Sequence, residues 1–215
     1  MKVPVGVLVS GSGSNLQALI DACADPAYPA QIAVVVSDRS AAFGLERARH
    51  AGIPAVHLGA RSFGGDRDAY DAALAGVLEA HGAEWVCLAG FMRIVGPCLL
   101  ARFPWRVLNI HPSLLPAFPG LHAQRQALEH GVRVAGATVH LVDGGMDTGP
   151  IVAQAAVPVY ESDDEDALSK RILAEEHRIY PLALRLAAEG RLGVDGRRVR
   201  TEGGTARSDP RTSGR

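Results

Sequence analysis

The sequence predicts an α/β fold in which a mostly parallel, twisted sheet of about seven strands carries helices on both faces. Short apolar runs alternate with segments of helical periodicity along the 215 residues. A glycine turn follows the first run, as in a Rossmann-like N-terminal half. Only residues 143–150 separate the last two strands. This connection is too short for a crossover helix, so we expect an antiparallel pair near the C-terminal end of the sheet.

Strands and helices are expected to alternate regularly along the chain. Each strand is a short apolar run, and each helix is a longer segment with apolar residues at helical spacing. The strands are expected at Val3–Val9, Ile32–Val36, Ala55–Leu58, Trp85–Leu88, Val107–Ile110, Ala137–Val142 and Ile151–Val157. The helices between them are expected at Asn15–Cys23, Phe43–Ala51, Asp66–His81, Pro97–Arg102 and His122–His130.

A final helix is expected after the seventh strand. Ser162-x-x-Glu165 has the pattern of a capping box, and Pro181 is expected to kink or restart the helix. Glu176 lies on the apolar stripe, where burial of an acid is costly unless a partner compensates for it. Glu176 either leans out at the edge of the stripe or points into a pocket and accepts hydrogen bonds from a hydroxylated ligand. The stripe consists of Leu168, Ile172, Ile179, Ala183 and Leu186.

Composition indicates one domain, which we expect to span residues 1–193. Hydrophobic residues make up 47% of the chain, enough for a full core. No run of 18 apolar residues is present, so no membrane span is expected. The three cysteines form no Cys-x-x-Cys pair, which indicates free thiols in a reducing, cytoplasmic compartment. A formal charge of −1 gives no general attraction to nucleic acid.

Residues 194–215 are expected to form a disordered, arginine-rich tail. Residues 196–215 carry six arginines against two acids, and Val199 is their only large apolar residue. Such a segment buries too little apolar surface to offset its ordering entropy. A basic RNA-binding arm is the alternative, but the segment has no aromatic residue that could stack on bases.

Asn109 and His111 lie two residues apart at the end of an expected strand, in the sequence VLNIHPSLLPAFPG. Residues two apart share one face of a strand, and Pro112 favours an extended His111. Both side chains are therefore expected to point together at the carboxyl end of a strand, where open α/β sheets bind their ligands. The alternative is that both only cap the last hydrogen bonds of the strand.

The segment VLVSGSGSNLQALI combines a strand, a glycine turn and an amphipathic helix. Backbone N–H groups at such a helix start, together with the helix dipole, suit a phosphate. A dinucleotide site is the weaker reading, because Leu16 replaces its third glycine, although Asp38 stands where such a fold holds a ribose. No lysine follows the glycines, which excludes a P-loop. The pattern favours a single phosphate held by Gly13, Ser14 and Asn15; the alternative is a plain turn with Ser14 or Asn15 as N-cap.

The connection VDGGMDTGPIV carries Asp143 and Asp147 in an irregular, glycine-rich loop. Loops held by a rigid sheet often carry catalytic groups, and a carboxylate beside His111 would stabilise its imidazolium form. The alternative is an Asx-type turn without chemistry. Metal binding by His111, His122 and His140 lacks a helical His-x-x-x-His or a cysteine partner, so no metal is expected.

Five stretches together resemble the phosphoribosylglycinamide formyltransferases of purine biosynthesis. They are GSGSN, AFGLERARHAGIP, LAGFMRIV, NIHPSLLPAFPGLHA and MDTGPIVAQAAVPV, and the resemblance runs from about Val5 to Leu192. It implies transfer of a formyl group from 10-formyltetrahydrofolate to the amine of phosphoribosylglycinamide, both of which are small molecules. The resemblance does not decide between a monomer and a homodimer.

The resemblance also implies roles for particular residues. It makes Asn109, His111 and Asp147 the catalytic groups. The amide of Asn109 and protonated His111 would donate hydrogen bonds to the oxyanion that forms when the amine attacks, while Asp147 keeps His111 charged. The phosphorylated acceptor is implied at Gly13, Ser14 and Asn15, with Glu176 at its ribose. The folate pocket is implied at Arg67, Met92, Arg93, Ile94, Val95, Asp143, Gly144, Gly145, Met146 and Asp147.

The sequence departs from the family pattern at two places. Leu173 and Ala174 stand where relatives often have polar residues near the phosphate, which leaves more of the phosphate binding to the glycine turn. The loop DGGMD has two glycines where relatives can carry bulkier residues. Related folate hydrolases and transfer-RNA formyltransferases are expected to need a further domain. A nucleotide-binding module without chemistry would not need Asn109, His111 and Asp147 together.

Overall fold

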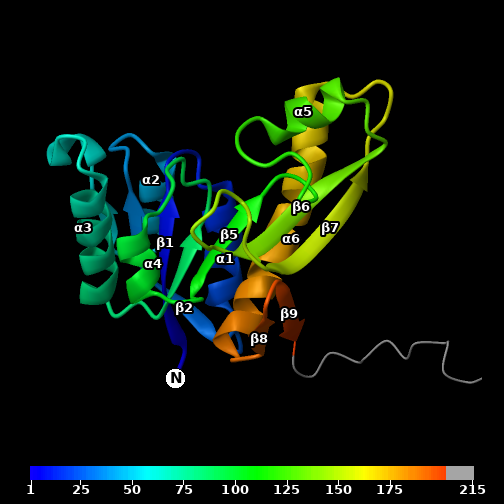
Figure 1. The fold of residues 1–215 in the computed structure, drawn as a ribbon. Coiled ribbons are helices and arrows are strands. Elements are labelled where there is room, and N and C mark those ends of the chain that lie inside the picture. The colour runs from blue at the N-terminus through cyan, green and yellow to red at the C-terminus, as the bar shows by residue number, and fades with distance from the viewer. Residues whose placement is uncertain (202–215) are drawn as a thin grey trace, which may run out of the picture.

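The computed structural model describes residues 1–201, and these residues form a nine-stranded sheet with helices on both faces (Figure 1). The strand order is β3-β2-β1-β4-β5-β6-β7-β9-β8. The α/β class and the mostly parallel sheet are confirmed. The sheet has nine strands rather than about seven, because two short strands form where the sequence predicted a disordered tail.

The first five strands form a parallel half-sheet with the order β3-β2-β1-β4-β5. This is the strand order of a Rossmann-like half. All five strands are parallel, but their order along the sequence reverses at β1, because β2 and β3 lie on one side of it and β4 and β5 on the other. The carboxyl ends of these strands therefore meet at one edge, where the chain builds its loops. The strands are β1 (Val3–Val9), β2 (Ala30–Ser37), β3 (Ala55–His57), β4 (Trp85–Leu88) and β5 (Val107–His111).

Two antiparallel strands extend this half-sheet. Strand β6 (Val134–Leu141) is antiparallel both to β5 and to β7 (Ile151–Pro158). The predicted antiparallel pair is confirmed, and β6 also reverses direction relative to β5. The β5–β6 register places Asn109 opposite His140 and His111 opposite Thr138. The sheet itself thereby brings residues from distant parts of the sequence to one place.

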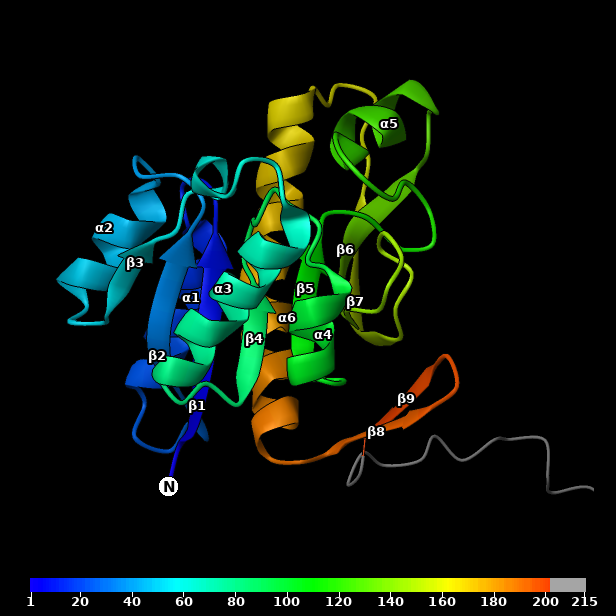
Figure 2. The same ribbon diagram turned by 60° about the vertical axis from the view of Figure 1, so that its left-hand side comes forward.

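Helices cover the two faces of the sheet in separate groups, which Figure 2 shows from a second direction. Strand side chains alternate, so that Val5 and Val7 join one core cluster while Leu8 joins the other. The first cluster is covered by α1 (Ser14–Ala24), α2 (Phe43–His50), α5 (Ala123–Glu129) and α6 (Glu165–Ala188). The second is covered by α3 (Arg67–Ala80) and α4 (Pro97–Arg102), with a short 3₁₀ helix at Ala60–Phe63 before α3.

The long helix α6 begins differently from the prediction. Its N-cap is Asp164, whose carboxylate accepts a hydrogen bond of 2.7 Å from the Ala167 N–H. The predicted capping box at Ser162 is therefore wrong, because Asp164 stands directly before the helix and its carboxylate caps the Ala167 N–H instead. The helix also continues through Pro181 without restarting. Within the described residues, no helix combines the length and the apolar character that crossing a membrane would require.

A short hairpin corrects the prediction of disorder from residue 194 onward. Strands β8 (Leu192–Asp195) and β9 (Arg198–Thr201) pair in antiparallel fashion across a two-residue turn. Gly196 in that turn has φ 58°, a conformation that glycine adopts at little cost. Local turn geometry and backbone pairing thus order a segment with little apolar content. The rest of the predicted tail, residues 202–215, lies outside the described residues.

Candidate active site

The candidate site lies at the carboxyl ends of β1, β4 and β5, beside the point where the strand order reverses. The glycine turn follows β1, the segment 90–96 follows β4, and Asn109 and His111 end β5. Ser10 joins the first two segments: its hydroxyl accepts a hydrogen bond from the Met92 N–H and donates one to Asp38. The carboxylate of Asp38, the acid of the dinucleotide alternative, is thus engaged within the protein.

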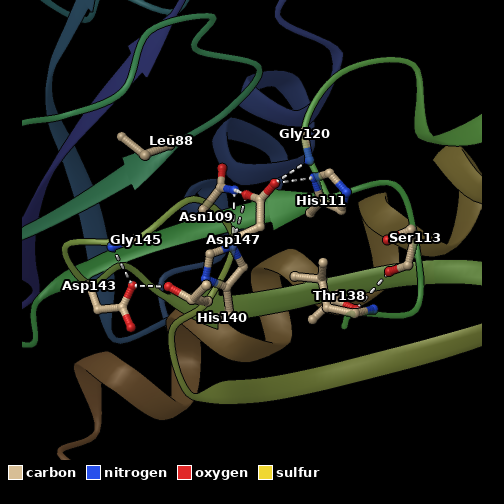
Figure 3. Close-up of polar contacts among 12 residues, drawn as sticks. Leu88, Asn109, His111, Ser113, Gly120, Thr138, His140, Asp143, Gly145 and Asp147 are labelled. Atoms are coloured by element: carbon tan, nitrogen blue, oxygen red, sulfur yellow. Dashed lines mark hydrogen bonds and ion pairs between the residues drawn. The ribbon is translucent and has the colours of Figure 1, made fainter. Parts of the chain in front are cut away.

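Asn109, His111 and Asp147 come together as the sequence predicted (Figure 3). The two carboxylate oxygens of Asp147 face different partners. Oδ2 is 3.4 Å from His111 Nδ1, and Oδ1 is 3.5 Å from Asn109 Nδ2. These contacts join the end of β5 to the loop between β6 and β7, so the two polar side chains do more than cap a strand.

Asp147 is held in its ionised form by its surroundings. Burial raises the pKa of this carboxyl, but a hydrogen bond from the neighbouring His140 ring, the Gly120 N–H and the charges of two histidines outweigh that effect and lower it. The Gly120 N–H donates to Oδ2 at 2.8 Å. A carboxylate that stays ionised beside His111 faces Nδ1 of that ring and fixes its orientation.

Both ring nitrogens of His111 face acceptors. Nδ1 faces Asp147, and Nε2 lies 2.9 Å from the Phe118 carbonyl oxygen. A ring that carries hydrogens on both nitrogens satisfies both contacts. His111 is 5% exposed, so its two partners are not replaced by bulk water.

The segment after His111 is held by a buried hydroxyl on the next strand. Thr138 donates to the Ser113 carbonyl oxygen at 2.7 Å and accepts from the Leu115 N–H at 3.1 Å. Figure 3 shows the contact between Thr138 and Ser113 beside Asn109, His111 and Asp147. The proline-rich segment that carries Phe118 is thereby fixed to β6, which places the Phe118 carbonyl against His111.

The loop that carries Asp147 has a restricted backbone. Asp147 adopts φ 54°, an uncommon value for a residue with a side chain, and such values cluster at functional sites. A Cβ on Gly149 would lie 1.7 Å from the Leu141 carbonyl oxygen, so that position requires glycine. Asp143 closes the loop by accepting hydrogen bonds from the Thr148 hydroxyl and the Gly145 N–H. The Asx-type turn of this loop therefore belongs to Asp143.

The glycine turn leaves the start of α1 open. Gly13 is the N-cap with φ 68°, and no side chain of the described residues caps the helix. The alternative in which Ser14 or Asn15 is the N-cap is therefore wrong. A Cβ on Gly13 would lie 2.7 Å from Gly44 Cα, which explains the need for glycine here. Uncapped N–H groups at the start of a helix suit an anion.

Glu176 is buried beside this turn, so the reading in which it leans out to solvent is wrong. It is 7% exposed and accepts a hydrogen bond of 2.7 Å from Asn15 Nδ2. Burial raises the pKa of Glu176 although this hydrogen bond lowers it. Asn15 is also buried, and its Oδ1 atom has no hydrogen-bond partner among the described residues. The pair therefore presents acceptors for a ligand that carries donors.

The residues assigned to the folate pocket fall into two groups. A cavity of about 450 Å³ brings Arg67 and Arg93 together with Ile94, and Arg93 lies over the Tyr70 ring. Val95 is buried in the core on the α3–α4 face instead. The second group, in the loop 143–147, lies beside Asn109 and His111, which Asp147 contacts. Three residues of this second group are exposed, namely Gly144, Gly145 and Met146. In the segment after β4, Met92, Arg93 and Ile94 are also exposed.

His140 is a member of the site that the sequence did not reveal as such. Its Nε2 atom is 3.1 Å from Asn109 Nδ2 and 3.7 Å from Asp147 Oδ1. The sequence suggested it only as a metal ligand, and no group of three or more His, Cys, Asp or Glu side chains in residues 1–201 is arranged to hold a metal ion. The signal that could have found it is alternation along β6, which gives His140 and Thr138 the same face.

Comparisons with known proteins agree with this geometry. The formyl transferase family matches residues 3–184. The phosphoribosylglycinamide formyltransferase of Escherichia coli K12 is 46% identical over 204 residues, which are 92% of this chain and 96% of that protein. The crystal structure of glycinamide ribonucleotide transformylase 1 from Symbiobacterium toebii has a TM-score of 0.91 and 61% identity, covering 93% of this chain and 94% of that one.

A longer relative matches as well. The trifunctional purine biosynthetic protein adenosine-3 of Drosophila pseudoobscura pseudoobscura is 50% identical over 190 residues, or 87% of this chain. The chain spans only 14% of the length of that protein. The family match covers the glycine turn, the end of β5, the Asp147 loop and most of α6. On this evidence the chain belongs to the formyl transferase family.

Proposed function

We propose that this chain transfers the formyl group of 10-formyltetrahydrofolate to the amine of N1-(5-phosphoribosyl)glycinamide, in de novo purine biosynthesis. The products are the N-formyl compound and tetrahydrofolate. The observation that carries the proposal is the contact of Asp147 with both His111 and Asn109, at the same edge of the sheet as a helix start with uncapped N–H groups. The names of the Escherichia coli and Symbiobacterium relatives support this choice of reaction.

The acceptor would bind along the start of α1. The N–H groups of Ser14 and Asn15, with the helix dipole behind them, suit its phosphate. Glu176 suits the ribose hydroxyls, because a buried carboxylate gains stabilisation from donors. The unpartnered Oδ1 atom of Asn15 is a second acceptor at the same place. The phosphate and ribose of the acceptor would thus be held at the start of α1, and the amine at the other end of the acceptor would extend toward His111.

The chemistry would take place at His111. As the amine attacks the formyl carbon, negative charge develops on the formyl oxygen, and a donor already in place stabilises it. His111 donates from Nε2 by exchanging the Phe118 carbonyl for that oxygen, while Asp147 keeps hold of Nδ1. His111, or a water beside it, then moves a proton between the two amines.

The folate would lie between the two groups of assigned residues. The loop 143–147 with the exposed side chain of Met146 offers apolar surface next to Asp147, and the exposed side chain of Met92 adds apolar surface on the segment after β4. Arg67 and Arg93, at the cavity between α3 and the segment after β4, suit carboxylates.

No metal takes part in this scheme, and we place the reaction in the cytoplasm. We also assign the activity to residues 1–193 as one domain, leaving a homodimer open and expecting no nucleic-acid partner.

The test is turnover of 10-formyltetrahydrofolate by the purified chain, with and without phosphoribosylglycinamide. Turnover that requires the acceptor, with stoichiometric formation of the formylated product, is the expected result. Turnover without acceptor would identify a hydrolase, and no turnover in either assay would identify a binding module. Both of these outcomes would overturn the proposal. The Asp147→Asn enzyme, whose turnover should fall about 10²–10⁴-fold, serves as the matched control for contaminating activity.

A further inference from the structure

His140 is a buried histidine that none of the proposed catalytic steps uses. It lies on β6 opposite Asn109 of β5, and only 2% of its surface is exposed. Its Nε2 atom faces Asn109 and Asp147, and its Nδ1 atom is 2.9 Å from the Leu141 carbonyl oxygen. Figure 3 shows its ring next to both side chains. One ring therefore touches two of the three proposed catalytic groups.

The partners of His140 determine where its hydrogens lie. Nδ1 faces a carbonyl oxygen and so carries a hydrogen, which makes Nε2 of a neutral ring an acceptor. Asn109 then donates one amide hydrogen to Nε2 at 3.1 Å and directs the other to Asp147 Oδ1 at 3.5 Å. In this arrangement both amide hydrogens of Asn109 are used inside the protein. The amide oxygen points away from His140 and Asp147.

Donation from Asn109 to a formyl oxygen requires the opposite orientation of the amide. When the amide turns about its last side-chain bond, its oxygen takes the place of its nitrogen beside His140 Nε2. That contact is favourable only if Nε2 carries a hydrogen, which makes the ring a cation because Nδ1 keeps its own. Asp147 Oδ1, 3.7 Å from Nε2, is the charge that compensates the cation.

We propose that His140 is a positioning residue, which holds the Asn109 amide inward in the free enzyme and releases it toward the formyl oxygen by taking up one proton from solvent beside Asp147, a proton that returns to solvent when the product leaves. This inference rests on the function proposed above. The groups that face the ring are Asp147 from the loop after β6 and Asn109 from β5, and His111 lies on the far side of the same carboxylate. The hydrogen bond and the charge by which the His140 ring lowers the pKa of Asp147 belong to its protonated form, in which Nε2 carries a hydrogen.

The test compares His140→Phe, which removes both hydrogen-bonding atoms, with His140→Gln, which keeps a side chain able to donate and accept. His140→Phe is expected to lower kcat by up to about 100-fold, the loss that a misplacement of a catalytic group by about 1 Å can cause. The KM values of both substrates should stay within about twofold, and His140→Gln should recover part of kcat. His81→Gln, at an exposed histidine that ends α3, is the matched control and should change nothing.

Two further readouts separate positioning from a merely structural role. Because His140 acts through Asn109, adding His140→Phe to Asn109→Ala should lower kcat by less than about threefold more. In both His140 variants the acid limb of the kcat profile should move to higher pH, because Asp147 loses a neighbour that lowers its pKa. If His140→Phe does not fold, His140→Gln still tests this movement. A folded variant with unchanged kcat, or with losses fully additive to Asn109→Ala, would overturn the inference.

A measurement without turnover distinguishes failure of this inference from failure of the proposed function. Nitrogen-15 NMR of labelled histidines in the free protein should show His140 with hydrogen on Nδ1 and none on Nε2 at neutral pH. Carboxyl NMR should show Asp147 titrating at higher pH in His140→Gln than in the wild type. If wild-type enzyme transfers no formyl group but both NMR results hold, the function fails and the coupling stands. If Nε2 carries hydrogen in the free protein, the inference itself fails.

Discussion

Replacing Glu176 with glutamine should weaken acceptor binding and stabilise the free protein at the same time. Glu176 is 7% exposed, and among the described residues its carboxylate accepts one hydrogen bond, from the Asn15 amide at 2.7 Å. Glutamine keeps the shape and can accept the same hydrogen bond, but it carries no charge. The substitution therefore tests whether the acid is retained for a ligand rather than for the fold.

The effect on binding follows from the loss of charge-assisted hydrogen bonds to the ribose hydroxyls. Such bonds are worth roughly 1.5–3 kcal/mol, so the KM for phosphoribosylglycinamide should rise about 10- to 150-fold. The KM for 10-formyltetrahydrofolate should change by less than about twofold. Steady-state kinetics with each substrate varied in turn measures both values.

The effect on stability depends on pH. Burial raises the pKa of Glu176 in the folded protein, so the ionised form is less favourable there than in the unfolded chain. Wild-type protein therefore has its full stability below the ordinary pKa of a glutamate, about 4.3, and loses part of it as pH rises through the raised value. Each unit by which the pKa is raised corresponds to about 1.4 kcal/mol of unfolding free energy. Glutamine does not incur this loss.

Urea unfolding of the free protein at about pH 8 and again near pH 4.5 measures this difference, with the lower pH chosen near the ordinary glutamate pKa. Glu176→Gln should be more stable than wild type at the higher pH, and its advantage should shrink at the lower pH. Glu175→Gln is the matched control, because that neighbour forms an ion pair with Arg178 on the surface and should have little effect on either measurement. A variant less stable than wild type at high pH, or equal weakening for both substrates, would refute the reasoning.

The catalytic groups and the chain end give three further predictions. Asp147→Asn and His111→Ala should each lower turnover about 10²–10⁴-fold, and the double variant should be little worse than the worse single one, because the two act as a unit; full additivity in kcat would contradict this. Gly149→Ala should displace the Asp147 loop and lower both activity and the urea midpoint, since its Cβ meets a backbone oxygen; a crystal structure with an unmoved loop would refute it. Truncation after Thr201 should leave turnover within about twofold, whereas truncation after Gly193 should also lower the urea midpoint, because it removes β9; a tenfold loss of turnover after Thr201 would show that residues 202–215 support the site.

The sequence predicted the parts of the site that depend on local pattern. The local pattern placed Asn109 and His111 on one strand face and Asp147 in a glycine-rich loop between two strands, while only the resemblance to a known family implied that the three act together. The alternation of strands and helices, also a local pattern, predicted the sheet. The orientation of Glu176 could not be settled locally, because it depends on α6 packing against α1 and on the partner Asn15.

The features that the sequence did not predict depend on contacts between residues distant in the sequence, or on a choice between neighbouring residues of similar type. His140 joins the site only because β6 pairs with β5 in one register, a contact between residues 31 positions apart. Asp164 and Ser162 are both good helix caps by type, and tertiary placement decided between them. The hairpin β8–β9 forms around Gly196 in a segment whose composition suggested disorder, because composition does not report on turn geometry.

The β5–β6 register has a consequence for insertions and deletions in this chain. Pairing begins at Thr138 opposite His111 and places His140 opposite Asn109. A residue gained or lost between 134 and 140 would turn the following side chains to the other face of the sheet and separate His140 from Asn109. A length change in the turn 131–133, before β6 begins, leaves that alternation intact. Natural or engineered length variation should therefore collect in the turn after α5 and be absent from the adjoining strand.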